Sequence, residues 1–157
     1  MDGIIVNNGT IVSVVFGGSG STEQGQTFIA TDVSGLVPGG TVSVTEIAAI
    51  KAYNTFIANG ITVSSTATPA LDGVYSVDDT SQASIATEAQ FISAFSEFTN
   101  GGTVSLSWPM ANGTLATFPN TASFMTFAKA SAQTVAAARL AVLQETTVMP
   151  SSTVTIP

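Results

Sequence analysis

The stretch from residue 73 to residue 143 most constrains what this chain can fold into, because it carries two helix patterns around a hairpin pattern. Apolar residues alternate through 74–77, and two carboxylates and two hydroxyls follow at 78–81. Apolar residues then recur at three- and four-residue steps from Ile85 to Phe95. This order predicts a strand that leads into a capped amphipathic helix over about residues 82–99, which ends at Asn100-Gly101-Gly102.

A β-hairpin and a second long helix are predicted for residues 103–143. Apolar residues alternate with small polar ones up to Trp108, and Asn112-Gly113 favours a tight turn before residues 115–118 return as the partner strand. Pro109 restricts this pairing to an edge or a strand end, because proline has no backbone N–H to donate. Asn120 or Thr121 is then expected to cap the last helix.

The first sixty residues predict a β-rich segment followed by one helix. Residues 4–6 and 10–16 predict a hairpin around Asn7-Asn8-Gly9, and further strands are expected near 27–30 and 41–44. Thr45 is expected to cap a helix that ends at Asn59-Gly60, and residues 61–64 predict a short strand after it.

These patterns together predict an α+β fold in three parts. A small β-rich attachment segment occupies residues 1–44, and a helix–strand–helix domain with a β-hairpin occupies residues 45–143. An extended C-terminal tail occupies residues 144–157.

Charged side chains are unusually rare, at 8% of 157 residues, where about 25% is typical of globular domains. Ten acids and three bases give a net charge of −7, so nucleic acid and anionic membranes would be repelled and are not expected as partners. The chain has neither Cys nor His, and a nucleophile with its general base cannot be assembled from what remains. We therefore expect no enzyme activity, no metal and no cofactor. A basic leader is missing after Met1, so the chain is expected to be made in a cytoplasm.

Three groups of residues could carry a site, each with a plainer interpretation beside it. Asp78 and Asp79 could hold a cation, but a carboxylate just before a helix more often caps it. Residues 17–22 are glycine-rich like a phosphate-binding loop, but they lack the required lysine and are interpreted as a linker. Glu88 and Glu97 are too far apart along one helix to act as a pair of glycosidase carboxylates.

An aromatic surface is the remaining candidate site. Trp108, Tyr75 and Tyr53 could stack on a sugar, with Asn112 beside them, although a lone Trp next to a hairpin turn is more often half-buried packing. Trp108, Tyr75 and Asn112 are therefore the candidate interaction residues.

Residues 46–143 resemble an uncharacterised domain family of bacteriophage tail-fibre and other tail-associated proteins. The resemblance is carried by the helix start at residues 49–53, the Tyr75 to Ile85 run with its Asp-x-x-Ser-Gln-x-x-Ile element, Trp108 followed by Asn112-Gly113, Phe118-Pro119, and the helix start from Phe124 to Phe127. Family members usually carry more charge on the last helix and near the Trp turn. No catalytic residues are established for the family, so the resemblance implies none.

The resemblance and the low charge together predict a structural component of a phage virion, in the tail, baseplate or tail fibre. Its expected partners are other tail or fibre subunits and further copies of itself, and residues 3–16 and 148–157 are expected to add strands to neighbouring chains. Two alternatives remain open: a receptor- or glycan-binding module of the tail, with Trp108 and Asn112 facing solvent, and a tail-fibre assembly chaperone.

Overall fold

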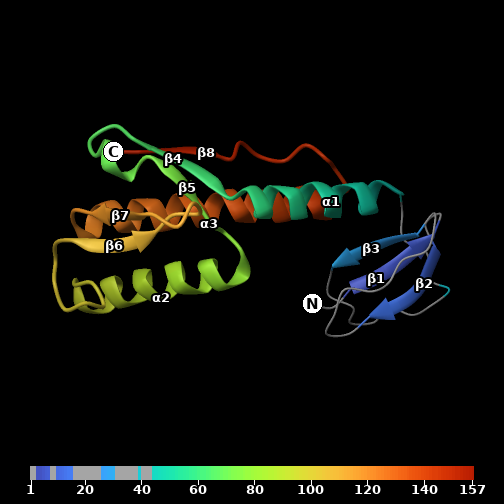
Figure 1. Cartoon of the computed structure of the whole chain (residues 1–157), viewed down its shortest axis with the longest axis horizontal. Coiled ribbons are helices and arrows are strands. Elements are labelled where there is room, and N and C mark those ends of the chain that lie inside the picture. Colours follow the sequence, from blue (N-terminus) through green and yellow to red (C-terminus); the bar gives the residue numbers. More distant parts are fainter. Residues whose placement is uncertain (1–2, 8–9, 16–25, 31–38, 40–43) are drawn as a thin grey trace. The chain divides into compact units, whose positions relative to one another are not determined.

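The computed structural model describes residues 3–7, 10–15, 26–30, 39 and 44–157. The chain has an α+β fold with a β-hairpin, as its sequence predicts, and is 48% helical and 22% strand (Figure 1). It divides into two compact units: Met1–Tyr53 with Ala141–Val148, and Asn54–Leu140 with Met149–Pro157. The three-part division expected at residues 44 and 143 stays a prediction.

The first unit contains a three-stranded antiparallel sheet. Strand β1 (Gly3–Asn7) lies in its centre and pairs with β2 (Thr10–Val15) on one side and β3 (Gln26–Ala30) on the other. These pairings confirm the predicted hairpin and the strand near residue 27, and Ile4, Ile5 and Ile11 are buried. The expected turn at residues 8 and 9, the loop at 17–22 and most of the strand at 41–44 lie outside the described residues.

Helix α1 (Val44–Asn59) begins two residues earlier than a cap at Thr45 predicts, so Thr45 lies inside the helix and does not cap it. The Thr45 hydroxyl instead donates a hydrogen bond to Glu145 Oε2 over 2.6 Å. The predicted end at Asn59-Gly60 is confirmed. Gly60 has a φ of +71°, and a Cβ there would lie 2.4 Å from the Tyr75 carbonyl oxygen, so both the backbone angle and the space require glycine.

The second unit has a mixed three-stranded sheet with β4 (Ile61–Ser65) in its centre. Strand β5 (Gly73–Tyr75) pairs with β4 in the antiparallel sense, and the short 3-10 helix η1 (Pro69–Leu71) joins the two. Strand β8 (Thr153–Ile156) pairs with the other edge of β4 in the parallel sense. The expectation that the C-terminal stretch is unpaired is therefore wrong, because its backbone already bonds within its own sheet, including Thr66 N to the Ile156 carbonyl over 3.0 Å.

Helix α2 (Asp79–Phe95) has the predicted cap: Asp78 Oδ1 accepts a hydrogen bond from Ser81 N over 2.8 Å. The helix ends four residues before the expected residue 99. Ser96 adopts a left-handed conformation with φ of +60°, and its N–H bonds to the Ile92 carbonyl. The chain turns there because Phe98 is fully buried, and a continued helix would not place that ring in the core.

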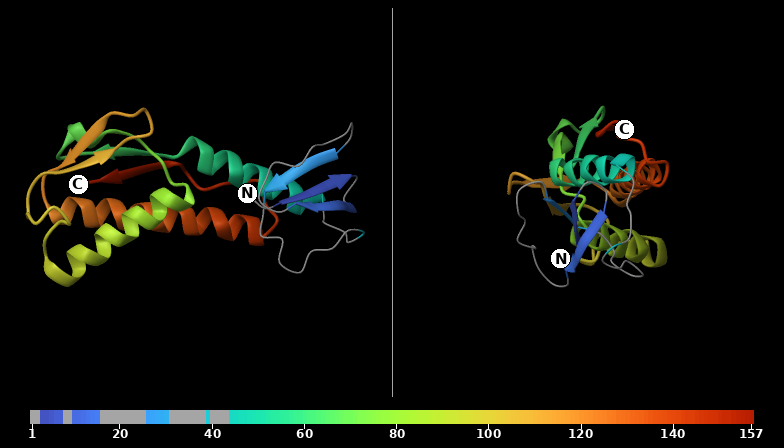
Figure 2. Two further views of the ribbon diagram at one scale, coloured as in Figure 1. Left: turned by 60° about the horizontal axis from the view of Figure 1, so that its bottom comes forward. Right: turned by 90° about the vertical axis from the view of Figure 1, so that its right-hand side faces the viewer.

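The predicted hairpin and last helix are confirmed as β6 (Leu106–Pro109), β7 (Leu115–Phe118) and α3 (Thr121–Leu143). Asn120 is the capping residue, since its Oδ1 accepts from Ser123 N over 2.9 Å. One aromatic ring from each of β5, β6 and β7 packs on the rings of Phe124 and Phe127 in this helix. The largest fully buried aromatic side chains of this core are Tyr75, Phe98, Phe118, Phe124 and Phe127. Helices α2 and α3 lie side by side in both views (Figures 1 and 2).

Candidate functional site

Tyr75 is part of the core and cannot stack on a ligand. Its side chain is 1% exposed, and its ring packs 4.8 Å from that of Phe127. The hydroxyl donates to the Leu71 carbonyl over 2.9 Å. Burial, and secondly the negative charge of Asp72, raises the pKa of Tyr75 from 10.0 to about 12. The aromatic surface expected from the sequence therefore loses this member, and Tyr53 belongs to the other compact unit.

Trp108 is half-buried on β6, as the packing interpretation predicts. Its ring meets the Phe124 ring edge-on, with 4.9 Å between centroids, and its backbone lies opposite Ala116 in the hairpin. Asn112 is exposed in the turn of this hairpin, where its Oδ1 accepts from Thr114 N over 3.0 Å and from the Thr114 hydroxyl over 2.7 Å. The amide oxygen of Asn112 thus shapes the turn.

A small hollow, the Trp108 pocket, is lined in part by the ring-bearing residue Trp108. It has a volume of about 140 Å³ and is lined by Trp108, Pro109 and Met110 on one side and by Ser76 and the first turns of α2 on the other. Thr80, Ser81 and Ser84 contribute hydroxyls there. The Ser84 hydroxyl donates to the Thr80 carbonyl, and within the described chain no hydrogen bond involves the hydroxyls of Ser76, Thr80 or Ser81. The pocket thus offers one aromatic ring and several free hydroxyls.

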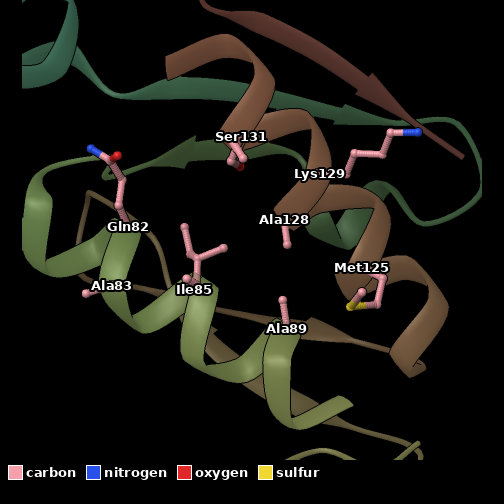
Figure 3. A pocket seen from close by; sticks show the side chains of 10 residues that line it. Gln82, Ala83, Ile85, Ala89, Met125, Ala128, Lys129 and Ser131 are labelled. Atoms are coloured by element: carbon pink, nitrogen blue, oxygen red, sulfur yellow. The ribbon is translucent and has the colours of Figure 1, made fainter. Parts of the chain in front are cut away.

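A larger apolar groove, the α2–α3 groove, lies between those two helices and has a volume of about 540 Å³. Figure 3 shows Ile85 and Ala89 of α2 and Ala128 of α3 pointing into it, with Met125 near one end. The side chains of the alanines on its flanks, including Ala86 and Ala132, are too small to fill the space between the two helices. The groove is therefore a recess in which apolar surface stays open to solvent.

The charged side chains near the α2–α3 groove lie at its borders and not on its floor. Arg139 Nη2 lies 3.2 Å from Gln82 Oε1 and 3.8 Å from Asp79 Oδ1, which ties α3 to the first turn of α2. Lys129 stands at the rim, and its exposed side chain extends away from α2 (Figure 3). Among the described residues, no ion pair or hydrogen bond involves the Lys129 ammonium.

Two of the carboxylates considered from the sequence, Asp78 and Glu88, have structural roles. Asp78 caps α2 as described above. Glu88 is 4% exposed and accepts hydrogen bonds from Thr99 N over 2.9 Å and from the Thr99 hydroxyl over 2.6 Å, whereas Glu97 lies exposed beyond the end of α2. No cluster of three or more acidic side chains suited to a metal ion occurs in the described part of the chain.

No known protein family, curated protein or solved structure matches this chain. The resemblance to phage tail-associated domains stays a prediction that rests on the residues quoted for it. Within the ranges that the structure describes, no helix is both long and apolar enough to cross a membrane.

Sequence reasoning missed the α2–α3 groove. The available signal was the alanine series at residues 83, 86 and 89, which lies on one flank of α2 beside the buried stripe of Ile85 and Ile92. Small side chains on that flank leave room that a neighbouring helix does not fill.

Proposed function

We propose that this chain is a structural component of a bacteriophage virion, in the tail, baseplate or tail fibre, and that it works by assembling with other subunits. The observation that carries the proposal is the α2–α3 groove, an apolar recess of about 540 Å³ that no other part of the second unit fills. Concave apolar sites of this size are typical of binding sites. The resemblance to tail-associated domains supplies the assignment to a phage particle.

The composition supports a surface made for contact with other subunits. Charged residues make up 8% of the chain, and depletion of charge is characteristic of the centre of protein–protein interfaces. Large apolar side chains of the second unit are also exposed, at Phe95, Val104, Leu115 and Leu140. Single exposed apolar residues are common on soluble proteins, so the proposal depends on the groove and not on their number.

Strand addition by the C-terminal stretch is not the route of assembly that we propose. Strand β8 already pairs with β4, and the outward edge of β8 is partly occupied. The Thr153 N–H is not free to donate to a neighbouring strand, because it donates to the Ser151 hydroxyl oxygen over 3.1 Å. A side chain that satisfies an edge backbone group lowers the tendency of that edge to pair with another chain.

The test is immunogold electron microscopy of intact particles from the source lysate, with antibody raised against the purified chain. Label on the tail tip, fibres or baseplate supports the proposal. A protein that is abundant in the lysate but missing from denatured particles would contradict it and would favour the assembly chaperone.

A second candidate function, binding of a receptor glycan, is favoured by the Trp108 pocket. One aromatic face beside several free hydroxyls suits a neutral sugar, which stacks through its apolar face and hydrogen-bonds through its edges. The test is titration of intrinsic fluorescence with host-surface oligosaccharides, because Trp108 is the single Trp of the chain. A change in emission that is lost in Ser81→Val supports binding, and emission unaffected by every sugar, with a ring that soluble quenchers cannot reach, rules it out.

A further inference from the structure

An apolar projection stands at the end of α2. The Phe95 side chain is 64% exposed, and its ring is held by that of Phe91, with 4.7 Å between centroids. The exposed carboxylate of Glu97 follows two residues later, in the turn after the helix. We call Phe95 and Glu97 the α2 knob. Leaving a phenyl ring in water costs free energy that burial would recover.

The α2–α3 groove complements this knob in size and in charge. A cavity of about 150 Å³ is enough to hold a benzene ring, so about 540 Å³ accommodates a phenyl ring together with the start of the turn that follows it. The knob carries an acidic group, and the rim of the groove carries Lys129. Two residues of chain span at most about 7 Å, so Glu97 can reach the rim while Phe95 occupies the groove.

The knob and the groove lie on different faces of α2, and the knob lies beyond the last residue of α2 that lines the groove, Ala89. Ala86, which lines the groove, and Phe95 are separated by nine positions, or about two and a half helical turns. Phe95 therefore cannot fill the groove of its own chain. A contact that joins one face of a subunit to a different face of the next is either made twice in a two-fold dimer, in which each knob fills the other copy's groove, or repeated along a ring or an open filament.

We propose that the α2 knob of one copy of this chain docks into the α2–α3 groove of a second copy, with Phe95 in the groove and Glu97 paired with Lys129. This inference rests on the proposed role as an assembling subunit and specifies its contact. One phenyl ring and one ion pair make a small interface, so a single contact between two free subunits is weak. The association is stronger where a closed dimer or ring, or neighbouring subunits in a particle, make a second contact intramolecular.

Sedimentation velocity over a range of protein concentrations tests the proposal with the intact chain. For the wild type, the mass is expected to grow with concentration, to a dimer or beyond. Phe95→Ser removes the knob and Ala86→Gln obstructs the groove, and each is expected to weaken association about tenfold or more. Both positions are exposed, and Gln is a good helix former, so both variants are expected to fold. Leu115→Ser is the matched control, since Leu115 is exposed to a similar degree, at 66%, and lies outside the contact.

Mixing the two variants gives the sharpest result. Phe95→Ser keeps its groove and Ala86→Gln keeps its knob, so an equimolar mixture is expected to form one-to-one dimers that cannot grow further.

The ion pair is tested by exchanging its charges. Glu97→Lys and Lys129→Glu are each expected to weaken association, and the double variant is expected to restore it.

Three outcomes would overturn the proposal: a wild type that stays monomeric, a Phe95→Ser variant that assembles like the wild type, or a mixture of the two variants that forms no dimers. The proposed virion role can be rejected independently of this contact. Wild-type chains that assemble as described while intact particles carry no antibody label would remove the virion role and leave the knob-and-groove contact standing.

Discussion

Replacing Glu88 by Ala should destabilise the second unit, because this buried carboxylate fixes the turn that follows α2. It accepts hydrogen bonds from the backbone N–H and the hydroxyl of Thr99, and these hold the chain where Phe98 enters the core. A hydrogen bond to a charged group contributes about 1.5–3 kcal/mol to stability. Thr99 is exposed, so water can replace part of its two lost hydrogen bonds in the variant. We expect the free energy of unfolding to fall by about 2–3 kcal/mol.

The assay is urea denaturation followed by the fluorescence of Trp108, which lies in the same compact unit as Glu88. For a chain of this size the loss corresponds to a melting temperature lower by roughly 4–12 °C. Glu97→Ala is the matched control, because Glu97 is an exposed carboxylate just beyond the same helix, and its removal should change stability by less than about 0.5 kcal/mol. A Glu88→Ala variant as stable as this control would refute the reasoning that the buried carboxylate holds the turn.

Three further predictions follow from the second unit. The pKa of Tyr75 is raised from 10.0 to about 12, so the folded state keeps the phenol proton to a higher pH than the unfolded state does. The free energy of unfolding is therefore unaffected by this group below pH 10 and falls between pH 10 and 12. Titration of tyrosinate absorbance should show one phenol that ionises late. Asp78→Ala should cost about 1 kcal/mol in urea denaturation through loss of the helix cap, while Asp79→Ala, which breaks an exposed ion pair with Arg139, should cost less than about 0.5 kcal/mol; equal losses would contradict the assigned cap. Gly60→Ala should lower stability by more than about 2 kcal/mol, because the new Cβ meets a backbone oxygen, and a melting temperature equal to that of the wild type would show that the backbone there can shift.

Local signals in the sequence were enough to place the helices and most strands. Asp78, Asn112-Gly113 and Gly60 act through their immediate neighbours, by capping, turning or stopping an element, so their effects can be predicted from short windows of sequence. The error at the end of α2 has a different origin. The helical spacing continues past Phe95, but the chain leaves the helix because Phe98 packs on Phe124, far along the sequence.

The contacts that define the candidate sites could not be predicted in this way. The parallel pairing of β8 with β4 joins segments about ninety residues apart, and nothing near either strand specifies its partner. Tyr75 was a candidate for a surface role because an aromatic residue in a strand suits either face of a sheet; its burial depends on the rings of Phe118 and Phe127. The α2–α3 groove likewise depends on how two helices meet, which their separate alanine patterns do not determine.

The parallel pairing of β8 with β4 also sets an order of events during synthesis. Ser65 at the end of β4 bonds to the carbonyl of Pro157, 92 residues further along the chain. At about 5–20 residues per second, a ribosome needs roughly 5–18 s to make the missing stretch. Strand β5 can cover one edge of β4 early, but the other edge stays unpaired throughout this interval. Newly made chains in a crowded cell therefore pass through a period in which they can pair with one another in the wrong way, and the length of this period is set by the rate of translation.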